Sequence, residues 1–211
     1  MADTPTDTEY RAMIAEHRTE LAGVLAGLPA RQWDAPTLCA GWRVREVVAH
    51  MTMPFRVRVA QFVWQLAKER GNFNRAADRI ARRDAAALTA DELTACLRDN
   101  AHHPWRPPGG GYAGALVHDL VHTLDIVDPV GIDAPLPADR LAVLTRLEPR
   151  GVKFFGVDLS GVRLRADDLD WTYGTGEPLR GRAQDLVLVV CGRRLPAGRL
   201  RGAASPRFTI A

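Results

Sequence analysis

The sequence has few lysines, few cysteines and no long apolar run. Of its 28 basic side chains only Lys68 and Lys153 are lysines, so arginine carries almost all of the positive charge. No stretch approaches the roughly 20 apolar residues that a membrane-spanning helix needs. The N-terminal MADTPTDTEY is polar and acidic, without the basic start and apolar centre of a signal peptide. We therefore expect a cytoplasmic protein with no membrane partner.

Three further classes of protein are disfavoured by what the sequence lacks. Its three cysteines, Cys39, Cys96 and Cys191, lie far apart. An odd number without a CxxC spacing argues against a disulfide framework and against a zinc ribbon. The arginines are scattered among acidic residues, whereas a nucleic-acid-binding face needs a clustered basic stripe interleaved with aromatic residues. With a formal net charge of only +3, the chain is expected to bind no nucleic acid.

What is present suits a soluble protein with a helical first part. The 211 residues are 46% hydrophobic, enough for a buried core. Apolar residues recur at helical spacing over 5–28, and a second helix is expected from about Arg43 towards Arg70, with Pro54 kinking or splitting it. One or two helices are predicted over 74–101, where Thr89 and Glu92 fit a capping box. After the breaker at 102–111, a last helix is expected over about 112–127.

The composition changes after PVGIDAPLP. A short helix is expected at about 138–148, followed by strand-like alternation in GVRLRA and DLDWTYG, with turn residues in GTGEPLRG. The run at 182–194 fits a buried helix or a strand, and its length and Gly-Arg ending favour the helix. The predicted fold class is mainly α. We expect a four-helix bundle over residues 1–148 and a small α+β domain over 149–211.

One run on the last predicted bundle helix could carry chemistry: GALVHDLVHTLDI, residues 114–126. Residues four apart share a helix face, so His118 and His122 can meet one ion, and Asp125 lies on the same side. Two imidazoles form half of a tetrahedral zinc site, and a further ligand must come from elsewhere. The same spacing also suits a buried polar stripe without metal.

A third histidine is predicted to face the core from the second helix. His50 is flanked by Val47, Val48 and Met51, and burying an imidazole among apolar neighbours costs less when it binds a metal or a good hydrogen-bond partner. Two helices thus supply candidate metal ligands. Three imidazoles suit zinc, nickel, copper and iron about as readily.

Three stretches resemble the maleylpyruvate isomerase family of mycothiol-dependent enzymes. These are PTLCAGWRVREVVAHM at 36–51, ALVHDLVHTLDI at 115–126, and DLDWTYGTGEPLRGRAQDLVLVVCGRR at 168–194. The resemblance implies a DinB-like four-helix bundle with a small C-terminal domain. It also implies a divalent metal, usually zinc, at the positions of His50, His118 and His122. His118 departs from the pattern, because the isomerases proper carry a glutamate there, and this replaces a negative ligand by a neutral one.

The resemblance further implies mycothiol as the thiol cosubstrate. Three protein ligands leave a position open on zinc, and a thiol bound there loses its proton near neutral pH. The thiolate could add to a cis double bond conjugated with a carbonyl, allow rotation and leave, or it could stay attached to an electrophile. The expected function is therefore isomerisation or S-transfer on a small unsaturated or electrophilic acid. A non-catalytic metal-binding bundle that serves as a sensor or interaction module is the alternative, and a bundle without metal is a third reading.

The sequence also suggests roles for residues other than the three histidines. Asp125 is expected to accept the free N–H of a ligating imidazole and so fix its tautomer. Cys39 is interpreted as a packed neutral thiol rather than a fourth ligand, and His102 and His103 as exposed loop residues. Arg193 either closes the last helix, where a cation is favoured, or binds substrate carboxylates, which makes it a weak catalytic candidate.

Overall fold

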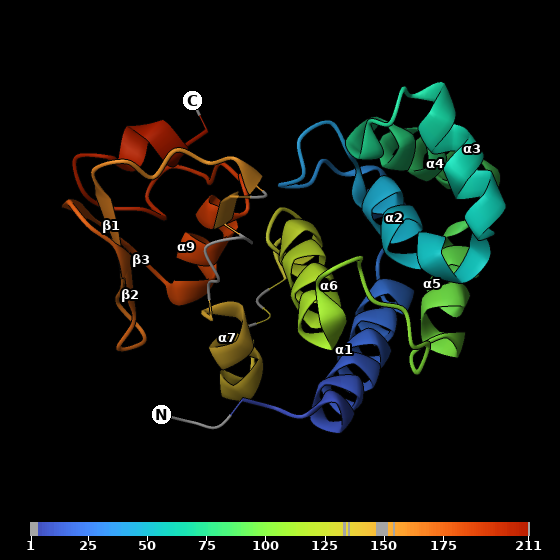
Figure 1. Cartoon of the computed structure of the whole chain (residues 1–211), viewed down its shortest axis with the longest axis horizontal. Helices are drawn as coiled ribbons and strands as arrows, with labels where there is room; N and C mark the ends of the chain where they lie inside the picture. Colours follow the sequence, from blue (N-terminus) through green and yellow to red (C-terminus); the bar gives the residue numbers. More distant parts are fainter. Residues whose placement is uncertain (1–3, 133, 135, 147–151, 154, 211) are drawn as a thin grey trace. The chain divides into compact units, whose positions relative to one another are not determined.

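A computed structural model describes residues 4–132, 134, 136–146, 152–153 and 155–210. Its contacts divide the chain into two compact units, Met1–Asp133 and Ala134–Ala211. The first unit is helical, and the second combines helices with a small sheet (Figure 1). The predicted class, a mainly α chain with a small α+β C-terminal part, is confirmed. The domain boundary predicted between residues 148 and 149 lies outside the described residues and stays a prediction.

The first helix, α1 (Asp7–Ala26), begins at a complete capping box. Thr6 Oγ1 accepts a hydrogen bond from the backbone N–H of Glu9 at 3.3 Å, and the Glu9 carboxylate accepts one from the backbone N–H of Thr6 at 2.7 Å. These two bonds satisfy donors that the first helical turn leaves without partners. Ile14, Leu21 and Leu25 form the buried apolar side of α1, as the periodicity predicts.

The stretch expected to be kinked or split at Pro54 is split into two helices, α2 (Val44–Arg56) and α3 (Val59–Lys68). Pro54 lies inside α2, and the break follows it, at Val57 and Arg58. A proline in the last turn removes one hydrogen bond of a helix that is about to end, so α2 tolerates it. The split thus occurs slightly after the predicted position.

The next stretch contains α4 (Phe73–Ala87), α5 (Ala90–Asp99) and α6 (Gly111–Val127). The predicted capping box begins α5, where Thr89 Oγ1 accepts from the backbone N–H of Glu92 at 3.2 Å and the Glu92 carboxylate accepts from that of Thr89 at 2.8 Å. The breaker at 102–111 separates α5 from α6, as expected.

Four of these helices close a ring of contacts and form the bundle. Helix α1 packs against α5 and α6, and α2 packs against the same two helices. Helix α4 covers another side of α2, and α3 packs on α4. The fully buried residues Leu25, Val47, Val48, Leu97 and Ile126 belong to the core that these elements enclose. The contact between α2 and α6 brings together the two helices that carry the candidate ligands.

The second unit contains α7 (Ala138–Leu144), strands β1 (Val162–Ala166), β2 (Thr172–Gly174) and β3 (Glu177–Gly181), helix α9 (Ala183–Val190) and a short 3-10 helix, Ser205–Phe208. The sheet order is β2-β1-β3, with β2 antiparallel and β3 parallel to β1. GTGEPLRG, residues 174–181, was expected to supply turn residues, but its last five residues, Glu177–Gly181, form a strand that pairs with Val162–Ala166. The helix favoured over 182–194 is confirmed as α9.

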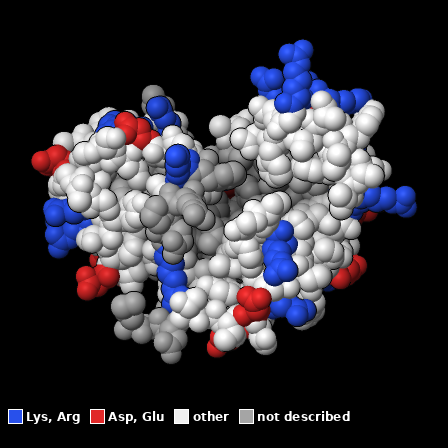
Figure 2. Space-filling model, viewed as in Figure 1, with Lys and Arg blue, Asp and Glu red and all other residues white. Residues whose placement is uncertain are grey.

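The surface carries both signs of charge. Figure 2 shows acidic and basic side chains spread over the C-terminal unit, whereas basic side chains project from the α3–α4 end of the helical unit. Arg58, Lys68, Arg70 and Arg75 are exposed in that segment. Among the described helices, none combines the length and the apolarity that a membrane crossing needs.

Candidate metal centre

The three histidines singled out in the sequence lie together between α2 and α6. Each of His50, His118 and His122 offers one ring nitrogen to a group whose members lie within 4.8 Å of one another. Nε2 of His50 lies 3.2 Å from Nε2 of His118. The rings of His118 and His122 have centroids 4.7 Å apart, as the four-residue spacing on one helix face predicts.

This donor set fits a divalent metal ion. Zinc–imidazole bonds of about 2.0–2.1 Å in a tetrahedral site place two ligand nitrogens roughly 3.3 Å apart, close to the 3.2 Å between His50 and His118. His118 and His122 both hydrogen-bond through Nδ1 to carboxylates, which leaves Nε2 of each ring available for coordination. Three neutral nitrogen donors with a position left over are the pattern of a catalytic rather than a structural zinc site.

The carboxylate of Asp125 orients the imidazole of His122 through a hydrogen bond. His122 Nδ1 donates to Asp125 Oδ2 at 2.9 Å, and Asp125 is fully buried. The backbone oxygen of Asp125 accepts a hydrogen bond from the backbone N–H of Leu38 at 3.2 Å, which ties the connection before α2 to α6. Such a carboxylate fixes the tautomer and the ring orientation of the imidazole that it accepts from.

A second carboxylate, which the sequence analysis missed, holds His118. Asp119 Oδ1 accepts from His118 Nδ1 at 2.9 Å, while its Oδ2 accepts from Arg18 Nε at 2.7 Å. Burial raises the pKa of Asp119, but hydrogen bonds and charge from His118 and Arg18 outweigh burial and hold that pKa below its usual value. One signal was available: Arg18 lies within the apolar stripe of α1, between Ile14 and Leu21, where a buried cation requires a buried anion.

Two tryptophans border the histidines. The ring centroid of Trp42 lies 5.1 Å from that of His50, and Trp105 lies edge-on to His118 at 5.2 Å. Trp42 is fixed by a 2.7 Å hydrogen bond from its indole N–H to Asp78 Oδ1. These rings place apolar surface beside His50 and His118.

The connection before α2, where the stretch 36–51 begins, is held in place by hydrogen bonds within the loop. Thr37 donates through its backbone N–H and its hydroxyl to the backbone oxygen of Trp42, at 3.0 and 2.9 Å. Glu46 then accepts from the backbone N–H of Arg43 at 2.8 Å, at the start of α2. The loop thereby places Trp42 directly before the helix that carries His50.

Residues 14–126 match the mycothiol maleylpyruvate isomerase N-terminal domain family, more than half of the chain. The chain belongs to this family. The match spans all three histidines and both carboxylates that hold them. No curated protein matches the chain.

Two solved structures share the fold of this family member. One is a crystal structure of the mycothiol-dependent maleylpyruvate isomerase, with 13% sequence identity and a TM-score of 0.63. The other is a histidine-to-alanine mutant of that enzyme, with 13% identity and a TM-score of 0.64. Each comparison covers 95% of this chain and 94% of the other. The likeness extends the family fold over both units of the chain.

Other residues considered from the sequence lie outside the histidine group. Among the described residues, the group that can hold a metal contains His50, His118 and His122 but not Cys39, which is partly buried and packs on the bundle core. His102 is exposed, as expected. His103 also lies outside this group, but it is partly buried and not exposed as expected, because its ring packs against Phe55 with the ring centroids 4.9 Å apart.

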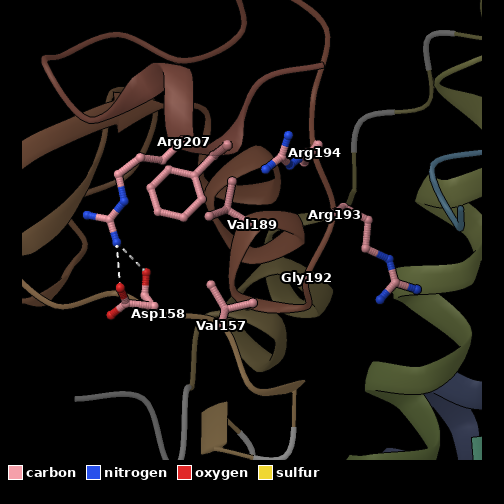
Figure 3. Close-up of a pocket in the computed structure, with 8 residues that line it drawn as sticks. Val157, Asp158, Val189, Gly192, Arg193, Arg194 and Arg207 are labelled. Atoms are coloured by element: carbon pink, nitrogen blue, oxygen red, sulfur yellow. Dashed lines mark hydrogen bonds and ion pairs between the residues drawn. The ribbon is translucent and has the colours of Figure 1, made fainter. Parts of the chain in front are cut away.

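Arg193 belongs to the C-terminal unit, just after α9. With Asp158, Arg194 and Arg207 it lines a cavity of about 390 Å³. Figure 3 shows the Arg193 side chain directed away from Asp158 and Arg207, which pair with each other at 3.1 Å. Arg193 Nη1 donates to the backbone oxygen of Cys191 at 2.5 Å, as a cation closing a helix does. Its contact with substrate stays a prediction.

Proposed function

We propose that this family member is a divalent-metal-dependent enzyme that uses a small thiol, of the mycothiol type, to isomerise or to derivatise a small unsaturated or electrophilic acid. The observation that carries the proposal is the group formed by His50, His118 and His122, with ligand nitrogens within 4.8 Å of one another. It lies within the segment that matches the mycothiol maleylpyruvate isomerase N-terminal domain family. Zinc is the proposed cation, and the three histidines are its proposed ligands.

A bound divalent cation would lower the pKa of a coordinated thiol and so supply a thiolate at neutral pH. The chain's own residues prepare for this. Asp119 and Asp125 each accept a hydrogen bond from an imidazole Nδ1–H, so that Nε2 of His118 and of His122 carries the free lone pair. Trp42 and Trp105 supply apolar walls, and an electrostatic interaction is stronger where water is excluded.

The proposed reaction needs no oxidant or reductant. The sulfur forms a bond to one carbon of a cis double bond conjugated with a carbonyl, and the former double bond becomes a single bond that can rotate. Loss of the same sulfur restores the double bond in the trans form and returns the thiol. With an electrophile that has a leaving group, the thiolate sulfur forms a bond to the carbon and the leaving group departs with its electron pair, so that the thiol is consumed, which is S-transfer.

The neutral ligand His118 favours one second candidate, a metal-binding bundle without catalysis. Three neutral imidazoles leave both charges of the cation uncancelled by its protein ligands, which raises its affinity for an anionic ligand from solution or from a partner. Such a protein would bind metal with the same stoichiometry but would turn over no thiol-dependent substrate. Activity therefore separates the two candidates.

Metal content is the first test. Protein purified without an affinity tag is analysed for metals beside His50→Ala and His118→Ala. About one zinc per chain, lost in both variants, supports the centre. No metal even after incubation with zinc overturns it, and the 3.2 Å contact between His50 and His118 is then a hydrogen bond.

Thiol-dependent turnover is the second test. The zinc-loaded protein is mixed with mycothiol and maleylpyruvate, and the free thiol is titrated while the acid is followed by its absorbance. Isomerisation leaves the thiol concentration unchanged, whereas S-transfer to an electrophilic acid consumes one thiol per product. Turnover lost in His50→Ala supports the proposal, and zinc binding without turnover favours the non-catalytic candidate.

Arg193→Ala, with Arg194→Ala as its matched control, tests whether Arg193 binds the acid. A rise in KM confined to Arg193→Ala supports that role.

A further inference from the structure

A buried ion pair connects α1 to the carboxylate that holds His118. Arg18 Nε donates to Asp119 Oδ2 at 2.7 Å, and the two side chains are 1% and 2% exposed. The second oxygen, Asp119 Oδ1, accepts from His118 Nδ1 at 2.9 Å. One carboxylate therefore bridges a guanidinium on α1 and a candidate ligand on α6.

Arg18 is held by further elements of the bundle. Its Nη1 donates to the backbone oxygens of Ala101 and His103 at 3.4 and 3.1 Å, in the connection after α5. Its guanidinium carbon lies 4.9 Å from the ring centroid of Phe55 on α2. A planar guanidinium fixed from several sides presents Nε in one direction, so it also fixes the carboxylate that accepts from it.

The pair also determines the charge around the metal centre. A lone buried carboxylate is strongly disfavoured, and a partner with the opposite charge removes much of that cost. A carboxylate paired with Arg18 still accepts a hydrogen bond from His118 Nδ1–H, while the pair as a whole is neutral. Asp119 can thus orient its imidazole without adding net negative charge near the cation.

We propose that Arg18 is a positioning residue of the metal centre: acting through Asp119, it fixes His118 with Nδ1 protonated and Nε2 directed at the cation, and it cancels the charge of that carboxylate. The inference rests on the proposed function, because it takes His118 as a ligand of a divalent cation. In the alternative, the ion pair between Arg18 and Asp119 only stabilises the packing of α1 against α6 and has no effect on metal binding.

A neighbouring contact supplies a matched control. His17 precedes Arg18 on α1, is buried, and forms a 2.8 Å hydrogen bond through Nε2 with Thr123 Oγ1 on α6. His17→Gln therefore disturbs the same interface between the same helices without touching His118. A purely structural role for Arg18 predicts that this control and the Arg18 variants have similar effects on metal binding.

The experiment measures zinc affinity by competition with a chromophoric chelator. Asp119→Asn leaves a buried guanidinium uncompensated near the cation and weakens the acceptor, so affinity should fall about 100-fold. The double variant Arg18→Met, Asp119→Asn carries neither buried charge, which favours a folded protein, and it should recover about tenfold of that loss. His17→Gln should stay within about twofold of the wild type.

Two results would overturn the role of Arg18. Either Asp119→Asn binds zinc within about threefold of the wild type, or the double variant binds it no better than Asp119→Asn. If Asp119→Asn does not fold, as circular dichroism would show, the double variant decides by itself. Its affinity must then lie about tenfold below that of the wild type, and an unchanged affinity would overturn the proposal.

A readout that needs no metal separates this inference from the proposed function. Nitrogen-15 NMR of metal-free protein, with the His118 signals assigned by His118→Gln, reports which ring nitrogen carries the proton. The wild type and His17→Gln should show the Nδ1–H tautomer of His118, and the double variant a mixture. An Nε2–H tautomer in the wild type overturns the inference. Zinc affinities that follow the expected pattern in a protein without thiol-dependent turnover overturn the proposed reaction alone.

Discussion

His122 and Asp125 lie one turn apart on α6 and form a hydrogen bond of 2.9 Å between Nδ1 and Oδ2, with the carboxylate fully buried. His118 makes the corresponding contact with Asp119, also at 2.9 Å. In both histidines of α6, a buried carboxylate accepts the hydrogen bond from Nδ1–H, which leaves Nε2 available to a cation. The third histidine, His50, comes from α2 and depends on the packing of α2 against α6.

Two substitutions on α6 should have unequal effects on metal binding. His122→Ala should abolish stoichiometric zinc binding and leave the bundle folded, because buried apolar side chains carry most of its stability. Asp125→Asn should keep the stoichiometry and weaken affinity roughly 10–100-fold, as loss of a ligand's hydrogen-bond partner does. Elemental analysis and chelator competition measure both quantities. His102→Ala, at an exposed histidine, is the control and should change neither. Equal losses from His122→Ala and Asp125→Asn would make Asp125 a direct ligand.

The buried pair between Arg18 and Asp119 makes a prediction about stability. Asp119→Ala leaves the guanidinium of Arg18 buried without its partner and should lower the free energy of unfolding by about 3–5 kcal/mol. Adding Arg18→Met should restore most of that loss, since the double variant buries no charge. Urea denaturation of the metal-free proteins measures both changes. A double variant less stable than Asp119→Ala would show that the contacts of Arg18 with the backbone after α5 matter more than its charge.

The start of α2 should depend on pH through Glu46. Burial raises the pKa of Glu46, but the hydrogen bonds and charge of Arg43 outweigh burial and lower that pKa below its usual value. A carboxyl whose pKa is lower in the folded than in the unfolded protein stabilises the fold above its unfolded pKa, about 4.3. That contribution is lost as the pH falls through the folded pKa. Glu46→Gln should therefore lower the free energy of unfolding by about 1 kcal/mol at pH 7.

The difference between the wild type and Glu46→Gln should shrink as the solution is acidified below about pH 4, where the wild-type carboxyl also becomes neutral. Urea titrations at several pH values measure it. Glu92→Gln is the comparison, because Glu92 forms the same kind of cap at α5 but is exposed, so its effect should be smaller. A difference that grows towards acid pH would contradict the assignment of the effect to the ionised carboxylate.

The sheet of the C-terminal unit depends on Gly176. Its φ is +121°, and a Cβ there would lie 2.2 Å from the backbone oxygen of Gly161. Gly176→Ala should therefore destabilise this unit by about 2 kcal/mol or more. Hydrogen exchange of the β1 amides reports on the unit by itself. Gly198→Ala is the matched control: φ is +87° but its Cβ meets nothing within 4 Å, so protection of β1 should fall less.

Local sequence patterns were sufficient to predict most of the helices and the pair of histidines on α6. The capping box of Thr89 and Glu92 predicted the start of α5, and the four-residue spacing of His118 and His122 put both on one helix face. These features depend on interactions within a few residues, which a sequence displays directly. Strand β3 was missed because Glu177–Gly181 becomes a strand through its parallel pairing with β1, and turn-rich residues do not indicate such a partner.

The sequence by itself determined the donor types, their spacing on α6 and the apolar surroundings of His50. The tertiary structure decided which groups meet: that His50 Nε2 lies 3.2 Å from His118 Nε2, and that Asp119 bridges His118 to Arg18. Arg18 and Asp119 are 101 residues apart, and neither is marked by its immediate neighbours as the other's partner. Helix periodicity specifies which face of a helix is buried, whereas the packing of α1 and α2 around α6 specifies which polar groups on the buried faces find each other.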